Sequence, residues 1–150
     1  SAVAFLGSDV GTRMSLATSA LGRAWLAGIA EPAGAALLAP WRKRGKLAAG
    51  FDAALAEARR CGYALSLGEW HPNINAAAVP LRTAGGEVVC LNCGGPAFVL
   101  SAERLREVVV PRLLQAAAAL AHDIGGVAGP ALTAAAPTPE PLTRPQKAAP

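Results

Sequence analysis

The sequence predicts a single α+β domain in which helices flank a mainly antiparallel sheet. Apolar residues recur at helical spacing in several segments. Three short apolar runs, at residues 63–67, 76–82 and 87–93, are typical of strands. Between the last two lies Ala84-Gly85-Gly86, which favours a hairpin turn because glycine adopts positive φ without strain. A hairpin pairs its strands antiparallel, so helices that accompany it predict the α+β class.

The predicted helices follow a strand over residues 1–6. One helix spans residues 16–30, with Ser15, Thr18 and Ser19 as candidate caps. A short helix begins at Pro32 and is expected to stop at Pro40. A third spans residues 52–61, and Gly62 is a natural stop after it.

A long helix begins after its cap Ser101, and Pro111 should kink it or split it in two. We expect its core-facing residues to be Leu105, Val108, Val109, Leu113 and Leu120. From Gly125 onward the helical spacing of apolar residues is lost, and the segment is rich in proline and alanine. The sequence therefore predicts a domain over residues 1–124 and a disordered tail over residues 125–150.

Net charge, cysteine content and the length of apolar stretches limit the classes of function that the sequence supports. The net charge is +4, and the dense basic cluster at residues 42–46 is better explained by a solvated loop than by a nucleic-acid patch. Three cysteines do not make a disulfide framework and suggest reduced thiols in a cytoplasmic protein. No stretch is long and apolar enough to span a bilayer, so we expect no membrane partner.

Few groups of residues in the sequence are suited to bind a ligand or a metal or to act in catalysis. The run from Thr18 to Gly22 sits at a helix start, where free N–H groups and small residues let a carboxylate approach, although an ordinary capped helix explains it too. Cys90 and Cys93 lie three apart on a predicted strand and so point to opposite faces, which argues against a metal site. We expect no cofactor. No catalytic motif is present, and Glu69 with His71 is the one acid–base pair that could support an enzyme.

Four segments resemble, in order, motifs of one bacterial family. The run VGTRMSLATSALGRA (residues 10–24) resembles a G-x-R-x-P-L-H-A-T-A-x-G-K-A signature. RRCGYA (residues 59–64) is similar to R-x-x-G-Y-A, AAAVPL (residues 76–81) to C-V-A-A-P-V, and the Gly-Gly-Pro at residues 94–96 to an S-G-P turn. Together they resemble the effector-binding domain of IclR-type transcriptional regulators from about Val3 to Ile124.

The resemblance implies a GAF/profilin-like fold, a pocket for a small organic or aromatic acid, and assembly into a homo-oligomer, a dimer or tetramer. It places the ligand carboxylate at the backbone of Ala20 and Leu21. By the same alignment, the pocket positions on the sheet are Ser66, Ala76, Asn92 and Gly94.

Several of these positions depart from the family pattern. Ser66 stands where an acid is common, Ala76 where Cys is usual, and Asn92 and Gly94 where serines are common. We hypothesise that the loop at residues 69–75 supplies the missing contacts. Its candidate ligand-binding residues are Trp70, Asn73 and Asn75.

The family's DNA-binding winged helix-turn-helix does not occur in the sequence, nor do the first helix and strands of its sensing domain. We therefore expect DNA to be bound only through that additional N-terminal domain, and a sheet edge or core to lie open unless a partner covers it. Two alternatives stay open. One is a GAF-like sensor or dimerisation module of another signalling protein, and the other is the small enzyme that uses Glu69 and His71.

Overall fold

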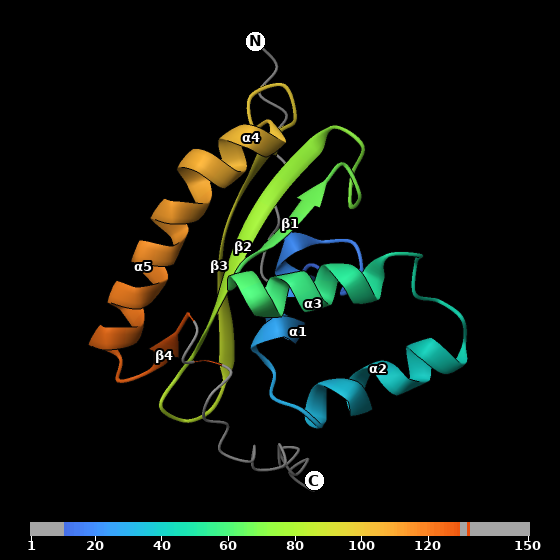
Figure 1. Ribbon diagram of the computed structural model, residues 1–150, viewed down its shortest axis with the longest axis horizontal. Coiled ribbons are helices and arrows are strands. Elements are labelled where there is room, and N and C mark those ends of the chain that lie inside the picture. The colour runs from blue at the N-terminus through green and yellow to red at the C-terminus, as the bar shows by residue number, and fades with distance from the viewer. Residues whose placement is uncertain (1–10, 130–131, 133–150) are drawn as a thin grey trace, which may run out of the picture.

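The computed structural model describes residues 11–129 and 132 and has helices on both faces of an antiparallel sheet (Figure 1). The strand expected at residues 1–6 lies outside the described residues. In chain order the elements are α1 (Ala20–Gly28), α2 (Ala33–Lys43), α3 (Phe51–Cys61), β1 (Ala64–Leu67), β2 (Ile74–Arg82), β3 (Val88–Pro96), α4 (Ala102–Arg104), the π-helical turn η1 (Leu105–Val109), α5 (Val110–Asp123) and β4 (Val127–Ala128). This arrangement confirms the predicted α+β class.

β2 is the central strand of the sheet. It pairs antiparallel with β1 on one side and with β3 on the other, and β4 pairs with its far end at Leu81 and Arg82. The expected hairpin joins β2 to β3, with Gly86 at φ 86°. Among the described residues, no strand pairs with the outer side of β3.

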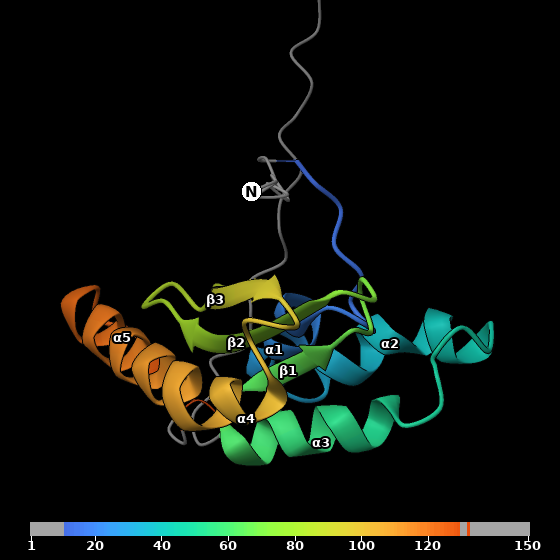
Figure 2. The same ribbon diagram turned by 90° about the horizontal axis from the view of Figure 1, so that it is seen from above.

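The two faces of the sheet carry different helices. On what we call the α1 face, α1 lies on the strands and α3 packs against α1 beside β1 (Figure 2). The continuous run α4–η1–α5 covers the opposite face, which we call the α5 face. Alternation along β2 divides its side chains: Ala76 and Ala78 pack on the α1 face, whereas Ala77, Val79 and Leu81 pack on the α5 face.

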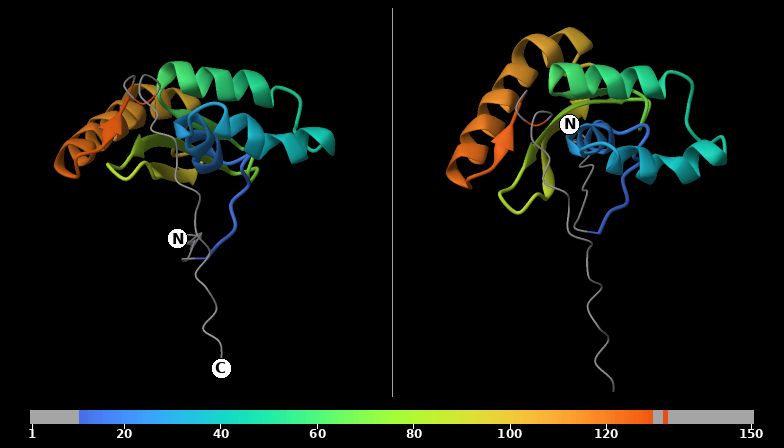
Figure 3. Two further views of the ribbon diagram at one scale, coloured as in Figure 1. Left: turned by 90° about the horizontal axis from the view of Figure 1, so that it is seen from below. Right: turned by 60° about the horizontal axis from the view of Figure 1, so that its bottom comes forward.

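α2 extends away from the sheet, as both views of Figure 3 show. The expectation that Pro40 ends this helix is wrong, because α2 continues to Lys43 with Pro40 inside it. The only buried residues of α2 are Gly34 and Leu38, and Ala36 is exposed, so water can reach the carbonyl that Pro40 cannot bond. The basic cluster at residues 42–46 begins in the last turn of α2 and is exposed, and Arg42 pairs with Asp52.

Two strands are longer than expected. β2 begins at Ile74, inside the segment predicted as a loop, and β3 runs through Gly94, Gly95 and Pro96 instead of ending there. Pro96 is the last residue of β3, whose outer side pairs with no strand in the described part of the chain, so its missing N–H costs no ladder hydrogen bond there. The chain then turns where Ala97 N–H donates to the Asn73 carbonyl (2.8 Å).

The long C-terminal helix changes geometry just before Pro111. Ser101 caps its start, since the side chain accepts from Arg104 N–H (3.1 Å). The π-helical turn η1 then precedes Pro111, which lies in the first turn of α5, so the helix continues without splitting.

The same π turn shifts the helical phase, and two of the expected core contacts are wrong. Val108 is 39% exposed and Leu120 is 37% exposed. The side chains that reach the sheet include Leu105, Val110 and Ala117.

The ordered chain continues past Ile124 into the segment predicted to be a tail. Gly126 passes so close to β2 that a Cβ there would lie 2.3 Å from the Arg82 carbonyl oxygen, and β4 follows at once. Residues 130–131 and 133–150 of that segment lie outside the described part. Across the described ranges, no helix is long and apolar enough to cross a membrane.

Candidate functional site

The turn before α1 is held by serines. Ser19 is the N-cap of α1, with extended backbone, and its hydroxyl accepts from Gly22 N–H (3.0 Å). The Ser15 carbonyl accepts from both the Ser19 N–H (3.2 Å) and the Ser19 hydroxyl (2.6 Å). Of the three candidate caps, Ser19 is the one that caps the helix, and Ser15 fixes the turn in front of it.

Two amides at this helix start are left over. The N–H groups of Ala20 and Leu21 have no hydrogen-bond partner among residues 11–129 and 132. They are the first two donors of α1, which has no acidic residue in its first turn. Free donors and the positive end of the helix dipole favour an anion at this position.

A row of residues on the sheet belongs to the same α1 face. Ser66 is directly opposite Ala76, and Ala76 is directly opposite Gly94. Ser66 is buried and its hydroxyl donates to the Thr18 carbonyl (2.7 Å), which ties the sheet to the turn before α1. Asn92 is exposed and lies opposite Ala78, a residue of the α1-face core. The register thus brings four predicted positions to the face that carries Ala20 and Leu21.

The loop residues predicted to join this site do not all do so. Asn75 alternates onto the α5 face, where its side-chain amide donates to the Leu100 carbonyl (2.8 Å), so the structure does not bring it to the helix start on the α1 face, and its role in ligand binding stays a prediction. Asn73 is exposed. Trp70 is half-buried with its ring 6.4 Å from that of His71, and within the described residues no hydrogen bond or ring contact joins its side chain to the α1 face.

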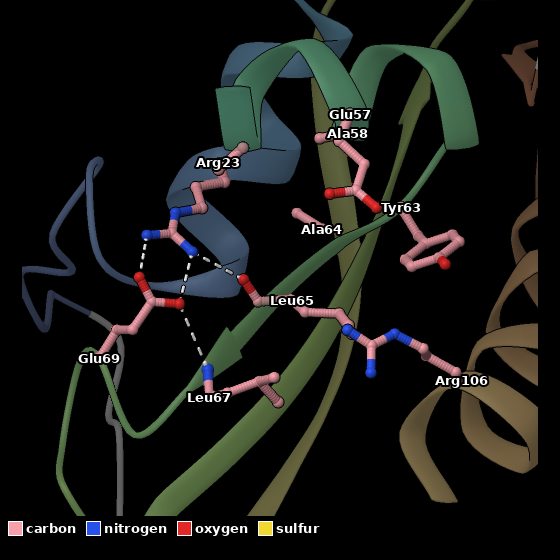
Figure 4. Close-up of a pocket in the computed structure, with 10 residues that line it drawn as sticks. Arg23, Glu57, Ala58, Tyr63, Ala64, Leu65, Leu67, Glu69 and Arg106 are labelled. Atoms are coloured by element: carbon pink, nitrogen blue, oxygen red, sulfur yellow. Dashed lines mark hydrogen bonds and ion pairs between the residues drawn. The ribbon is translucent and has the colours of Figure 1, made fainter. Parts of the chain in front are cut away.

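Arg23 is the residue that the sequence did not reveal. It is 7% exposed and donates to the carbonyls of Ala17 (2.7 Å) and Leu65 (2.9 Å) and to both carboxylate oxygens of Glu69 (Figure 4). One guanidinium therefore connects the turn before α1, strand β1 and the loop after it. The arginine positions the helix start relative to the sheet.

An apolar hollow of about 290 Å³ opens beside the same helix start. Leu21, Gly22 and Trp25 of α1 form one side, Val88, Val89 and Cys90 of β3 form another, and Met14 and Leu16 complete it. The free first-turn amides and a hollow that accepts apolar groups are thus neighbours, because Leu21 belongs to both.

Comparison with known proteins identifies the domain. A sequence profile described as "Bacterial transcriptional regulator IclR C-terminal" matches residues 2–123. The chain belongs to the IclR family. No curated protein matches this IclR domain.

Solved structures agree with this assignment. An IclR-family transcriptional regulator from Brucella abortus is 36% identical, with a TM-score of 0.69 over 81% of this chain and 47% of that one. A regulator from Rhodococcus sp. RHA1 is 26% identical, with a TM-score of 0.67 over 80% and 52% of the two chains. The chain therefore spans about half the length of these regulators.

The inducer-binding domain of PobR from Acinetobacter shares the fold of this IclR domain. It is 23% identical, with a TM-score of 0.61 over 73% of this chain and 67% of that one. Its structure is a double mutant in complex with 3-hydroxybenzoic acid.

Cys90 of the IclR domain is a protonated thiol facing the hollow. Burial raises its pKa to about 12, so at neutral pH the thiolate is scarce. Cys93 pairs with Ala77 of the α5 face, as expected for residues three apart on a strand. In the described part of the chain, no three metal-ligating side chains cluster.

We expect Cys90 to be the slowest of the three cysteines to react with iodoacetamide at about pH 8, because alkylation requires the thiolate. Peptide mapping after timed labelling measures each rate. Labelling of Cys90 ahead of Cys61 and Cys93 in the folded domain would contradict the buried environment.

The acid–base pair that would support an enzyme is not assembled in this IclR domain. The Glu69 carboxylate bonds to Arg23, which lowers the pKa of Glu69 below its ordinary value of 4.5. No hydrogen bond joins Glu69 to His71. A carboxylate held ionised and occupied by a guanidinium is poorly suited to general-base work.

Proposed function

We propose that this domain senses a small organic acid whose carboxylate accepts hydrogen bonds from the N–H groups of Ala20 and Leu21. The observation that carries the proposal is the pair of amides at the start of α1 that find no partner in the described part of the chain, in a turn that also borders an apolar hollow. A carboxylate satisfies both donors and interacts favourably with the helix dipole. The hollow takes the apolar remainder of the acid.

Four sheet positions on the α1 face favour an acid with a polar substituent. Ser66, Ala76 and Gly94 form a row of small residues opposite the helix start, and Asn92 supplies an exposed amide nearby in the register. The complex of PobR with 3-hydroxybenzoic acid supports the idea that this fold holds an aromatic acid. A hydroxylated aromatic acid or a short oxoacid is the ligand class that we propose.

We also propose the setting in which the domain works. The IclR-family matches are about twice as long as the chain, which supports a role within a longer cytoplasmic transcriptional regulator. In that regulator a separate DNA-binding domain would contact the operator, and homo-oligomerisation would bring copies together. Light scattering on the full-length protein, with and without acid, tests the oligomer.

Replacing Ala20 with proline tests the carboxylate contact. Ala20 is the first residue of α1, where proline lacks the N–H without breaking an intrahelical bond, and Ser19 before it is already extended. Losing one charge-assisted hydrogen bond should weaken acid binding by roughly 10- to 100-fold. Isothermal titration with 3-hydroxybenzoate, benzoate and pyruvate measures the change.

A matched control is Ala102→Pro, which places proline in the same position of the other serine-capped helix. It should leave acid affinity within about twofold of wild type if α1 is the site. Equal weakening by both variants, or undiminished binding to Ala20→Pro, would show that the carboxylate does not contact this amide.

A further inference from the structure

A second hollow, of about 180 Å³, lies along the outer edge of β1 (Figure 4). It is bounded by α3 on one side and by η1 on the other, and Ala58 and Tyr63 contribute to its lining. Arg23 and Glu69 close one end. This edge hollow shares none of its lining residues with the hollow beside Leu21.

The backbone of β1 offers one more donor to the edge hollow. Its Leu65 carbonyl accepts from Arg23, and its Leu67 N–H donates to Glu69 (3.5 Å), so the outward peptide groups belong to these alternate residues. In an antiparallel strand the N–H and C=O of one residue point to the same side. The Leu65 N–H therefore points outward too, whereas the Leu65 carbonyl already accepts from Arg23. A whole added strand would have to displace both side-chain caps, whereas a small molecule would not.

Two side chains of opposite charge border this position. Glu57 reaches toward β1 from α3, and Arg106 reaches toward it from η1, on either side of the strand (Figure 4). Within residues 11–129 and 132, neither forms an ion pair or a hydrogen bond. Arg23 and Glu69, by contrast, satisfy each other. The edge hollow thus offers the Glu57 carboxylate to a cationic group of a ligand. It offers the Arg106 guanidinium and the Leu65 N–H to an anionic group.

We propose that the edge hollow binds a small zwitterion, an α-amino acid of about the size of alanine. Its carboxylate accepts from the Arg106 guanidinium and the Leu65 N–H, and its ammonium group donates to Glu57. The hollow is smaller than the roughly 300–1,000 Å³ of drug-sized sites, which restricts the ligand to a short side chain. Arg23, which lines the edge hollow, also bonds to the Ala17 carbonyl in the turn before α1.

Titration with L-alanine tests this assignment on the whole chain. We expect saturable binding with a Kd on the order of 1 mM or below, detected by calorimetry and by a rise in Tm. Propionate, which lacks the ammonium group, and ethylamine, which lacks the carboxylate, should bind at least about tenfold more weakly. Glu57→Gln and Arg106→Gln should each weaken alanine binding by about tenfold or more.

Matched neutralisations outside the edge hollow are Arg60→Gln on α3 and Glu107→Gln on η1, and both should leave alanine affinity within about twofold. Ala20→Pro should leave it unchanged as well, which separates this site from the proposed acid site. Absence of saturable binding overturns the proposal. So does equal affinity for alanine and propionate, or loss of affinity in Ala20→Pro but not in Arg106→Gln. Acid binding at α1 is measured independently of all three outcomes.

Discussion

Gly22→Ala should destabilise the domain by about 3 kcal/mol and lower its Tm by roughly 10 °C. In an ordinary helix this substitution stabilises by about 1 kcal/mol, because alanine has the higher helix propensity. Here the new Cβ would lie 2.5 Å from both the Leu16 Cα and the Ser15 carbonyl oxygen. Those atoms are backbone, so the whole turn before α1 must move.

The movement should also abolish acid binding, since the Ser15 carbonyl holds Ser19, the cap of α1. Gly34→Ala is the matched control in α2: its Cβ would meet the ends of Arg59 and Glu31 at 3.0 and 3.2 Å, and flexible side chains can shift. Urea unfolding of both variants measures the difference. A Gly22→Ala protein as stable as Gly34→Ala would contradict the close approach of the turn to α1.

Arg23→Met should cost about 3 kcal/mol of unfolding free energy. The methionine keeps the apolar stem but leaves the carbonyls of Ala17 and Leu65 without their donor. The two lost hydrogen bonds account for most of the expected free-energy cost, because the Glu69 side chain is 44% exposed and solvent screens its ion pair with Arg23. We expect the variant to lose acid affinity as well, since only the Ser66 hydroxyl bond to the Thr18 carbonyl would still tie the turn before α1 to β1.

Glu69→Gln isolates the ion pair and should cost about 1 kcal/mol or less at neutral pH. Arg23 lowers the folded-state pKa of Glu69 below the ordinary value of 4.5. The contribution of the pair is therefore complete above that value and is lost as pH falls through the folded pKa. The stability difference between wild type and Glu69→Gln should shrink as the pH is lowered from about 7 to 3. A difference that grows in acid, or an Arg23→Met protein of wild-type stability, would contradict the assigned contacts.

Local signals in the sequence predict much of this fold. Ser19, Gly62 and the hairpin at residues 84–86 follow from rules that depend on a few neighbouring residues. Pro40 and Pro96 are where local rules fail, since each depends on whether its surroundings need the missing N–H. The Ala36 carbonyl, which Pro40 cannot bond, reaches water, and among the described residues no strand pairs with the outer side of β3, where Pro96 lies.

The candidate site is only partly visible in the sequence. The first turn of α1 could be predicted, because helix starts leave free donors wherever they occur. The face of Asn75 could not be predicted, because it depends on β2 beginning two residues earlier than expected and on the carbonyl of Leu100. The Arg23–Glu69 pair joins residues far apart in the chain, and nothing local marks either partner.

The most direct measurement of the central claim is a proton–nitrogen NMR titration of the labelled chain with 3-hydroxybenzoate, followed at the backbone amides of Ala20 and Leu21. We predict that both amide protons shift downfield with a common saturation curve, as expected for donors that gain a carboxylate acceptor, and that the methyl ester of the same acid leaves them in place. Saturable binding of the acid with these two amides unmoved would contradict the account.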